Sequence, residues 1–257
     1  NHPFDASFST RYNSEFWDMI EIFESMEIWN GATPFAAGTI NAKAFKKWLS
    51  LLDEGKRLTA TTGSDTHNIY GDDYFGMTEW LDWLMDIVMK HPEIYPEQMN
   101  EKVAYLTWLY KKVWPRLLSW VEQSNTPSTI HNYVYTNGKN QPQEILQAIR
   151  EGHSFISNGP LITAEINGVS YGDTATLKDN TGKLSVHVFS KKPINHLWMY
   201  TGVDKKVEIC TGSGSLEGGF AYDIVTDEFD FGGASWALFV ADGGENNLAI
   251  SNPILFA

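Results

Sequence analysis

The sequence predicts an α/β fold in which strands and helices alternate in the first part of the chain and an antiparallel β-sandwich follows. Three observations predict this fold. Residues 1–77 mix short helices with short apolar strands, residues 78–125 carry a helical pattern, and from about residue 154 apolar and polar residues alternate between Gly and Asn turns. Short alternating strands with frequent turn signals are typical of a β-sandwich.

The first part of the chain has the order strand, helix, strand. Residues 26–29 predict a short apolar strand that ends at Asn30 and Gly31, and residues 58–62 predict a second strand. A helix between them begins at Asn41 and has apolar residues at helical spacing before a C-cap glycine, namely Ala44, Phe45, Trp48, Leu49, Leu52 and Gly55. This order is typical of layered or barrel β/α folds, whose active sites gather at the carboxyl ends of strands.

A helical segment follows. The pattern predicts one helix over residues 79–90 and another from Pro96 to about Gln123, with Pro115 as a kink. The segment is rich in tryptophan, with Trp80, Trp83, Trp108, Trp114 and Trp120. We interpret residues 78–130 as a helical insertion that packs on its neighbour, and a lid over a ligand is the alternative.

The rest of the chain is expected to be rich in strands. Residues 131–136 predict a strand, and Pro142 opens a helix that ends at Gly152. Further on, Asn167-Gly168 is a strong hairpin signal. The predicted parts of the chain are therefore residues 1–77, 78–130, 131–160 and 161–257.

Composition narrows the function. The chain has 32 acidic and 19 basic residues, a formal net charge of −13, and no run of Lys or Arg. Such a charge disfavours a nucleic acid or an anionic membrane as partner. The single cysteine, Cys210, excludes an intramolecular disulfide and a cysteine-based zinc site. No apolar run approaches the ~18 residues of a membrane span, and the composition is compatible with secretion.

The strongest candidate site is the segment from Gly63 to His67, which follows the strand predicted at residues 58–62. Asp65 and His67 are two residues apart, so both can turn into one pocket at the end of the strand. A carboxylate oxygen and an imidazole nitrogen suit Zn, Mn or Fe. We expect Asp65 and His67 to bind a divalent metal and to act in catalysis; a turn with a capping aspartate is the alternative.

Two more residues are candidate metal ligands. His2 precedes Pro3, which holds it in an extended conformation that fits a ligand at a strand end; a terminal residue without a role is the alternative. Glu27 lies among apolar neighbours, and a buried carboxylate needs a partner. It is therefore a metal ligand, a hydrogen-bond acceptor behind the ligands, or an exposed residue on the alternate face.

The other polar groups with catalytic potential have less support. We do not expect metal binding by the remaining histidines, which are His91, His131, His153, His187 and His196. Cys210 is isolated in a strand-rich region and is expected to serve packing. Ser64 has no nearby His–Asp arrangement that is independent of the proposed metal ligands, so a serine hydrolase is not favoured.

Several motifs, taken in order, resemble the later part of the PHP (polymerase and histidinol phosphatase) metallohydrolases, most closely the branch named after the carbaryl hydrolases CehA and McbA. The motifs are HPF at residues 2–4, MEIWNG at 26–31, GSDTH at 63–67, AIREG at 148–152, SNGP at 157–160 and NPI at 252–254. The resemblance spans nearly the whole chain except residues 78–130.

The resemblance implies a fold and a set of ligands. Residues 1–77 would be later strands of a distorted (β/α)7 barrel, residues 131–160 its last strand and helix, and residues 161–257 a β-sandwich domain. His2, Asp65 and His67 match metal-ligand positions of the family, and Glu27 matches a recurrent acidic position. In the family, a metal-activated water attacks a phosphorus or carbonyl centre.

The family's opening His-x-His motif and the ligands of the first half of the barrel have no counterpart in this sequence. We therefore expect the missing half to be supplied elsewhere, or the chain to form a homo-oligomer. Three protein ligands and a water would still make a catalytic metal site. The sequence predicts a metal-dependent hydrolase of a small-molecule phosphoester, or of a related ester or carbamate. The alternative is a non-catalytic module that binds carbohydrate or protein and keeps a vestigial metal site.

Overall fold

A computed structural model describes residues 17, 19–31, 35, 37–64, 86, 90, 130–138, 141–210, 214–216, 218–244 and 247–257. The chain divides into two compact units, one of residues 1–63 with 130–257 and one of residues 64–129. In the second unit, Lys90 Nζ lies 2.7 Å from Asp86 Oδ2 in an i,i+4 ion pair. None of the described helices is long and apolar enough to cross a membrane.

The first unit begins with a short 3-10 helix, η1 (Ile20–Ile22), followed by strand β1 (Ser25–Asn30), helix α2 (Ile40–Asp53) and strand β2 (Thr59–Gly63). β1 and β2 pair in parallel, which confirms the predicted order of strand, helix and strand. Thr39 caps α2 by accepting a hydrogen bond from the Ala42 amide. The Trp48 indole donates to the Leu58 carbonyl at 2.7 Å, which fixes the helix to the start of β2.

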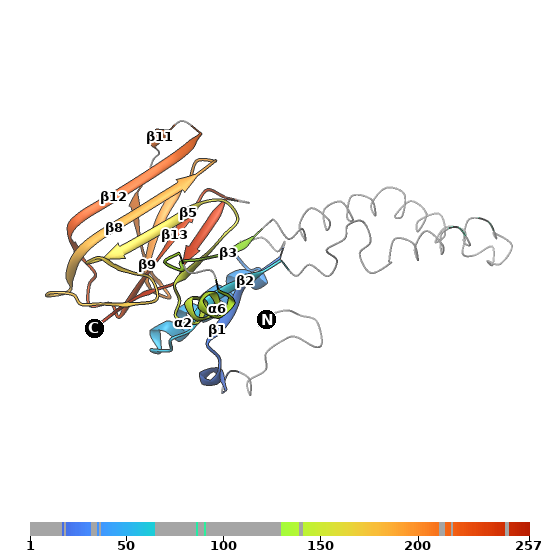
Figure 1. The fold of residues 1–257 in the computed structure, drawn as a ribbon, viewed down its shortest axis with the longest axis horizontal. Coiled ribbons are helices and arrows are strands. Elements are labelled where there is room, and N and C mark those ends of the chain that lie inside the picture. The colour runs from blue at the N-terminus through green and yellow to red at the C-terminus, as the bar shows by residue number, and fades with distance from the viewer. Residues whose placement is uncertain are drawn as a thin grey trace. The chain divides into compact units, whose positions relative to one another are not determined.

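Two largely antiparallel sheets make up most of this unit (Figure 1). The larger sheet has the order β10-β9-β13-β14-β4-β3, with β15 and β7 attached through β13, and the smaller sheet has the order β11-β12-β8-β5-β6. The strands of the larger sheet are β3 (His131–Val134), β4 (Ser154–Ser157), β7 (Thr174–Ala175), β9 (His196–Gly202), β10 (Lys205–Cys210), β13 (Trp236–Asp242), β14 (Leu248–Ser251) and β15 (Ile254–Phe256). The strands of the smaller sheet are β5 (Leu161–Ile166), β6 (Val169–Ser170), β8 (Thr181–Ser190), β11 (Gly214–Leu216) and β12 (Gly219–Asp230).

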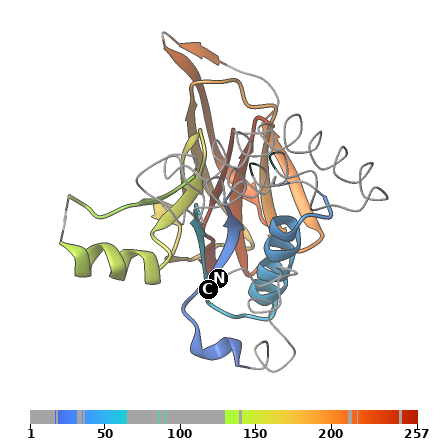
Figure 2. The ribbon, with the colours of Figure 1, turned by 90° about the vertical axis from the view of Figure 1, so that its right-hand side faces the viewer.

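Strand β13 shows how the layers are stacked. Trp236, Leu238 and Val240 belong to one core cluster, together with side chains of α2, β1 and β2. Ala237 and Phe239 point to the opposite face, where they belong to the cluster shared with the smaller sheet. Since successive side chains of a strand point to opposite faces, the larger sheet is a middle layer covered on both sides. Figure 2 shows α2 and the second helix, α6 (Pro142–Arg150), on two sides of the parallel pair.

The predicted later part of a (β/α)7 barrel, a TIM-like barrel, is wrong. Within the described residues there is one parallel strand–helix–strand unit, β1-α2-β2, and no barrel closes around it. The next strand, β3, pairs with β4 in antiparallel direction and belongs to the larger sheet of the sandwich. The same local pattern of strand, helix and strand occurs in a single unit and in a barrel built from several units. The pattern therefore did not determine how many units follow. The antiparallel β-sandwich itself was predicted correctly.

Two asparagine side chains join the parallel pair to the larger sheet. Asn132 of β3 accepts from the Thr62 amide at 3.0 Å and donates to the Thr62 carbonyl at 2.7 Å. Asn252 is 1% exposed; it accepts from the Ala60 amide at 2.7 Å and donates to the Ser154 carbonyl at 2.9 Å. Each side chain satisfies buried backbone groups as a neighbouring strand would.

Candidate functional site

Glu27 is the one predicted ligand whose position the structure describes. It lies in the middle of β1, where it pairs with Thr61 of β2 just before an irregularity in the register. Its neighbours Met26 and Ile28 are also buried, so both faces of this strand are covered. Only 8% of Glu27 is exposed. The exposed position, one of the three alternatives for this residue, is therefore wrong.

The Glu27 carboxylate lies against the last residue of β2. A Cβ atom added to Gly63 would come within 2.9 Å of Glu27 Oε1. Gly63 therefore provides the room that the carboxylate occupies. In the sequence, Ser64, Asp65 and His67 follow at once.

The other predicted ligands, His2, Asp65 and His67, lie outside the described residues. Among the described part of the chain, no group of three or more His, Cys, Asp or Glu residues could hold a metal ion. Glu27 thus contributes one carboxylate at the end of the parallel pair. The rest of the predicted donor set would have to come from the segment after Gly63 and from the start of the chain.

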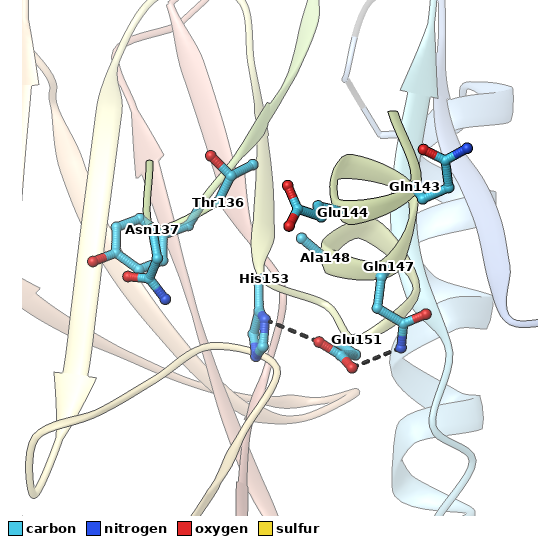
Figure 3. A pocket seen from close by; sticks show the side chains of 9 residues that line it. Thr136, Asn137, Gln143, Glu144, Gln147, Ala148, Glu151 and His153 are labelled. Atoms are coloured by element: carbon cyan, nitrogen blue, oxygen red, sulfur yellow. Dashed lines mark hydrogen bonds and ion pairs between the residues drawn. The ribbon is translucent and has the colours of Figure 1, made fainter. Parts of the chain in front are cut away.

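A separate pocket, of about 330 Å³, lies beside helix α6 (Figure 3). It is formed by the end of β3 and the loop after it, one face of α6, and the start of β4. Its lining residues are Tyr135, Thr136, Asn137, Gln143, Glu144, Gln147, Ala148, Glu151 and His153. Sequence reasoning did not single out this site, because its polar residues lie on three elements that are joined only in the folded chain.

His153 lies between two carboxylates. Its Nδ1 is 3.4 Å from Glu151 Oε2, and its Nε2 is 3.2 Å from Asp173 Oδ1. Gln147 Nε2 in turn donates to Glu151 Oε1 at 2.7 Å, as Figure 3 shows. Both ring nitrogens thus face carboxylates, and these two contacts orient the ring of His153.

The pocket and the Glu27 carboxylate lie at opposite ends of β2. At its first residue, the Thr59 hydroxyl donates to the Arg150 carbonyl at 3.2 Å, next to the end of α6 and the pocket. Glu27 lies against the last residue, Gly63. A strand rises about 3.3 Å per residue, so roughly 13 Å of strand separates the two places. They are two distinct candidate sites.

Comparison of the chain with protein-family models, with curated proteins and with solved structures found no match. The class that the geometry defines is structural: a β-sandwich with one parallel strand–helix–strand unit on its larger sheet. The resemblance to the PHP metallohydrolases thus rests on the sequence motifs, and its functional content belongs to a proposal.

Proposed function

We propose that this chain carries a metal-dependent hydrolytic site for a small phosphoester, or for a related ester or carbamate, at the carboxyl end of the parallel pair. The observation that carries the proposal is the buried Glu27 carboxylate, which lies against Gly63 at the end of β2. The Asp65–His67 segment begins two residues later. Carboxyl ends of parallel strands are where β/α proteins gather their ligands.

The donor set fits a divalent metal. Glu27 and Asp65 would supply carboxylate oxygens and His67 an imidazole nitrogen, which suits Zn, Mn or Fe. When bound, such a metal would lower the pKa of a water molecule and neutralise charge that develops on the attacked phosphoryl or carbonyl oxygen. Only 8% of Glu27 is exposed, so its carboxylate is largely shielded from bulk water. Its role would be to supply one carboxylate from β1, while Asp65 and His67 would supply the other donors.

The experiment is elemental analysis of the purified chain beside His67→Ala and Glu27→Gln. We expect the parent to retain Zn, Mn or Fe after dialysis against metal-free buffer, and both variants to lose it. His131→Ala is the matched control, because His131 is exposed in β3 and belongs to no proposed site. If the parent holds no metal even after reconstitution with each of the three ions, the proposal fails.

A second candidate function is a carbohydrate-binding module, and the pocket beside α6 favours it. Tyr135 is 61% exposed and lines the pocket together with the amide and carboxyl groups of Asn137, Gln143 and Glu144. An aromatic ring offers a flat apolar face to a sugar, and the amides and carboxylates offer hydrogen bonds to its hydroxyl groups. Screening of the parent and Tyr135→Ala on a glycan array tests it. Binding that is lost in Tyr135→Ala and insensitive to Glu27→Gln would support this function over the first.

A further inference from the structure

Three polar side chains form a hydrogen-bonded chain on the outer face of the smaller sheet. Ser185 Oγ lies 3.0 Å from His187 Nε2, and His187 Nδ1 lies 2.6 Å from Asp223 Oδ1. The two contacts use the two different nitrogens of the imidazole ring. A hydroxyl, an imidazole and a carboxylate are thus joined in one line.

The sheet itself fixes this arrangement. Ser185 and His187 are two residues apart in β8, so they share a face, and Leu184 and Val186 between and beside them are fully buried on the other face. Asp223 of β12 is the direct partner of His187 in the antiparallel register. β8 lies between β12 and β5 in the sheet, so this pairing is held on both sides.

The carboxylate determines which nitrogen carries the proton. An ionised carboxylate only accepts hydrogen bonds, so the neutral imidazole donates to Asp223 from Nδ1. Nε2 then carries the free lone pair and accepts the Ser185 hydroxyl proton. These are the relations among nucleophile, base and orienting acid that activate a serine for attack.

We propose that Ser185 is the nucleophile of an acyl-transfer site that accepts acyl groups from activated aryl esters. Ser185 Oγ attacks the acyl carbon while His187 Nε2 takes the hydroxyl proton. The bond from the acyl carbon to the aryl oxygen breaks, and the leaving phenolate receives that proton from His187. The products are an acyl-serine ester at Ser185 and a phenol. No metal takes part, so the site is independent of the function proposed above.

The surroundings of Ser185 suit an aryl ester. Val225 pairs directly with Ser185 across the strands and is 56% exposed, and Phe189 is the next residue after His187 on the same face. The apolar side chain of Val225, beside Ser185, offers contact area to an aromatic leaving group, and Phe189 adds apolar surface further along the same face. The acyl donor is accordingly an ester with a flat apolar leaving group, not a charged one.

The sheet also limits the rate. The backbone of β8 is paired on both sides, with β12 and with β5, so its N–H groups around Ser185 are used within the ladder. Donors to a developing oxyanion contribute about 10²–10³ in rate, and a positioned general base contributes about 10²–10⁴. We therefore expect one acylation of Ser185 that exceeds that of an ordinary serine by roughly 10²–10⁴, followed by slow release.

The test is to incubate the full chain with p-nitrophenyl acetate, quench it, and map acetylated residues by peptide mass spectrometry. Acetylation of Ser185 should exceed that of Ser170, a partly exposed serine in strand β6 of the same sheet whose hydroxyl donates to the Ala164 carbonyl. His187→Gln should lower acetylation of Ser185 about 100-fold, since it removes the base. Asp223→Asn should lower it less, and EDTA should leave it unchanged.

Two outcomes overturn the proposal. One is acetylation of Ser185 no greater than that of Ser170 in the parent. The other is a burst of p-nitrophenol release that persists in Ser185→Ala, because the acyl acceptor would then be His187 or a lysine. Circular dichroism of each variant checks that the sheet is intact. The failure of the metal site would appear separately, as absence of metal from the parent.

Discussion

The Glu27 carboxylate occupies the space that a side chain on Gly63 would need, with only 2.9 Å between Glu27 Oε1 and the position of a Cβ atom on Gly63. Glu27 comes from β1 and Gly63 from the end of β2, and the two strands pair in parallel. A small residue at the end of one strand thus sets where the carboxylate of the other can lie. The pair links the fold to the proposed metal site, because the Asp65–His67 segment follows Gly63.

Gly63→Ala should weaken metal binding with little loss of stability. The φ angle of Gly63 is not among the positive ones, so alanine fits its backbone. The atom in conflict is the far end of a side chain, which can rotate away at a cost of about 1 kcal/mol. The rotation moves the carboxylate, so we expect metal affinity to fall at least tenfold at nearly unchanged melting temperature. Calorimetric titration with the metal measures the affinity, and a thermal melt measures the melting temperature.

The control for that change is Gly202→Ala. An added Cβ there meets the Lys205 side chain at 3.4 Å or more, an ordinary contact, and Gly202 lies at the end of β9 in the larger sheet. Metal affinity should match that of the parent. Equal affinity in Gly63→Ala and Gly202→Ala would remove Glu27 from the proposed site.

The alternation of β5 and β8 was predicted from the sequence, because apolar residues at every second position mark a strand with one buried face. The strand–helix–strand unit was predicted for a similar local reason. The barrel was not correct, since the number of such units depends on contacts between distant segments. Asn252 is an example of such a distant contact. Its side chain accepts the hydrogen bond of the Ala60 amide, as a neighbouring strand would, although the two residues are 192 positions apart in the chain.

The candidate sites likewise divide into those set by local sequence, which could be predicted, and those set by contacts between distant segments, which could not. Glu27 within a predicted strand, and the Asp65–His67 pair just after another, stand out from the local sequence alone. The spacing of Ser185 and His187 places them on one face of a strand, but their partner Asp223 is 36 residues from His187 and is set by the register of β8 with β12. The pocket beside α6 likewise depends on three elements meeting. Sequence reasoning can find residues on one element, and it misses those that pairing brings together.

Asn252→Ala should destabilise the first unit. The substitution removes the acceptor for the Ala60 amide and the donor to the Ser154 carbonyl, both buried. Buried groups left without partners cost about 1–3 kcal/mol each, so we expect the free energy of unfolding to fall by roughly 2–6 kcal/mol. Urea denaturation measures the change.

Asn195→Ala is the matched control for the loss of an asparagine side chain. Asn195 is exposed, and its backbone amide, which alanine keeps, donates to the Asp242 carbonyl at 2.7 Å. Its free energy of unfolding should stay within about 0.5 kcal/mol of the parent. A similar loss in both variants would mean that Asn252 does not join β2 to the larger sheet.

Asp53 joins the end of α2 to the sandwich, and its removal should loosen the helix. Its carboxylate accepts from the Val203 amide at 3.0 Å and from the Trp236 indole at 3.2 Å. Hydrogen bonds to a charged group contribute about 1.5–3 kcal/mol, reduced here because the Val203 contact is exposed. We expect Asp53→Ala to lower the free energy of unfolding by about 1–3 kcal/mol. Slower amide exchange in α2 of the variant than in the parent would contradict this.

Tyr171 should make stability fall at high pH. Burial raises the pKa of Tyr171 to about 12, and the neighbouring charge of Tyr135 adds to the effect. The unfolded value is 10.0, so the stabilising contribution of the neutral phenol is fully present below about pH 10 and is lost as pH rises to about 12. The shift of about two pKa units corresponds to about 3 kcal/mol.

The free energy of unfolding should therefore fall less steeply between about pH 10 and pH 12 in Tyr171→Phe than in the parent. Tyr135→Phe, whose ring is largely exposed, should keep most of the parent's slope, and equal slopes in all three proteins would show that Tyr171 ionises as freely in the folded chain as in the unfolded one.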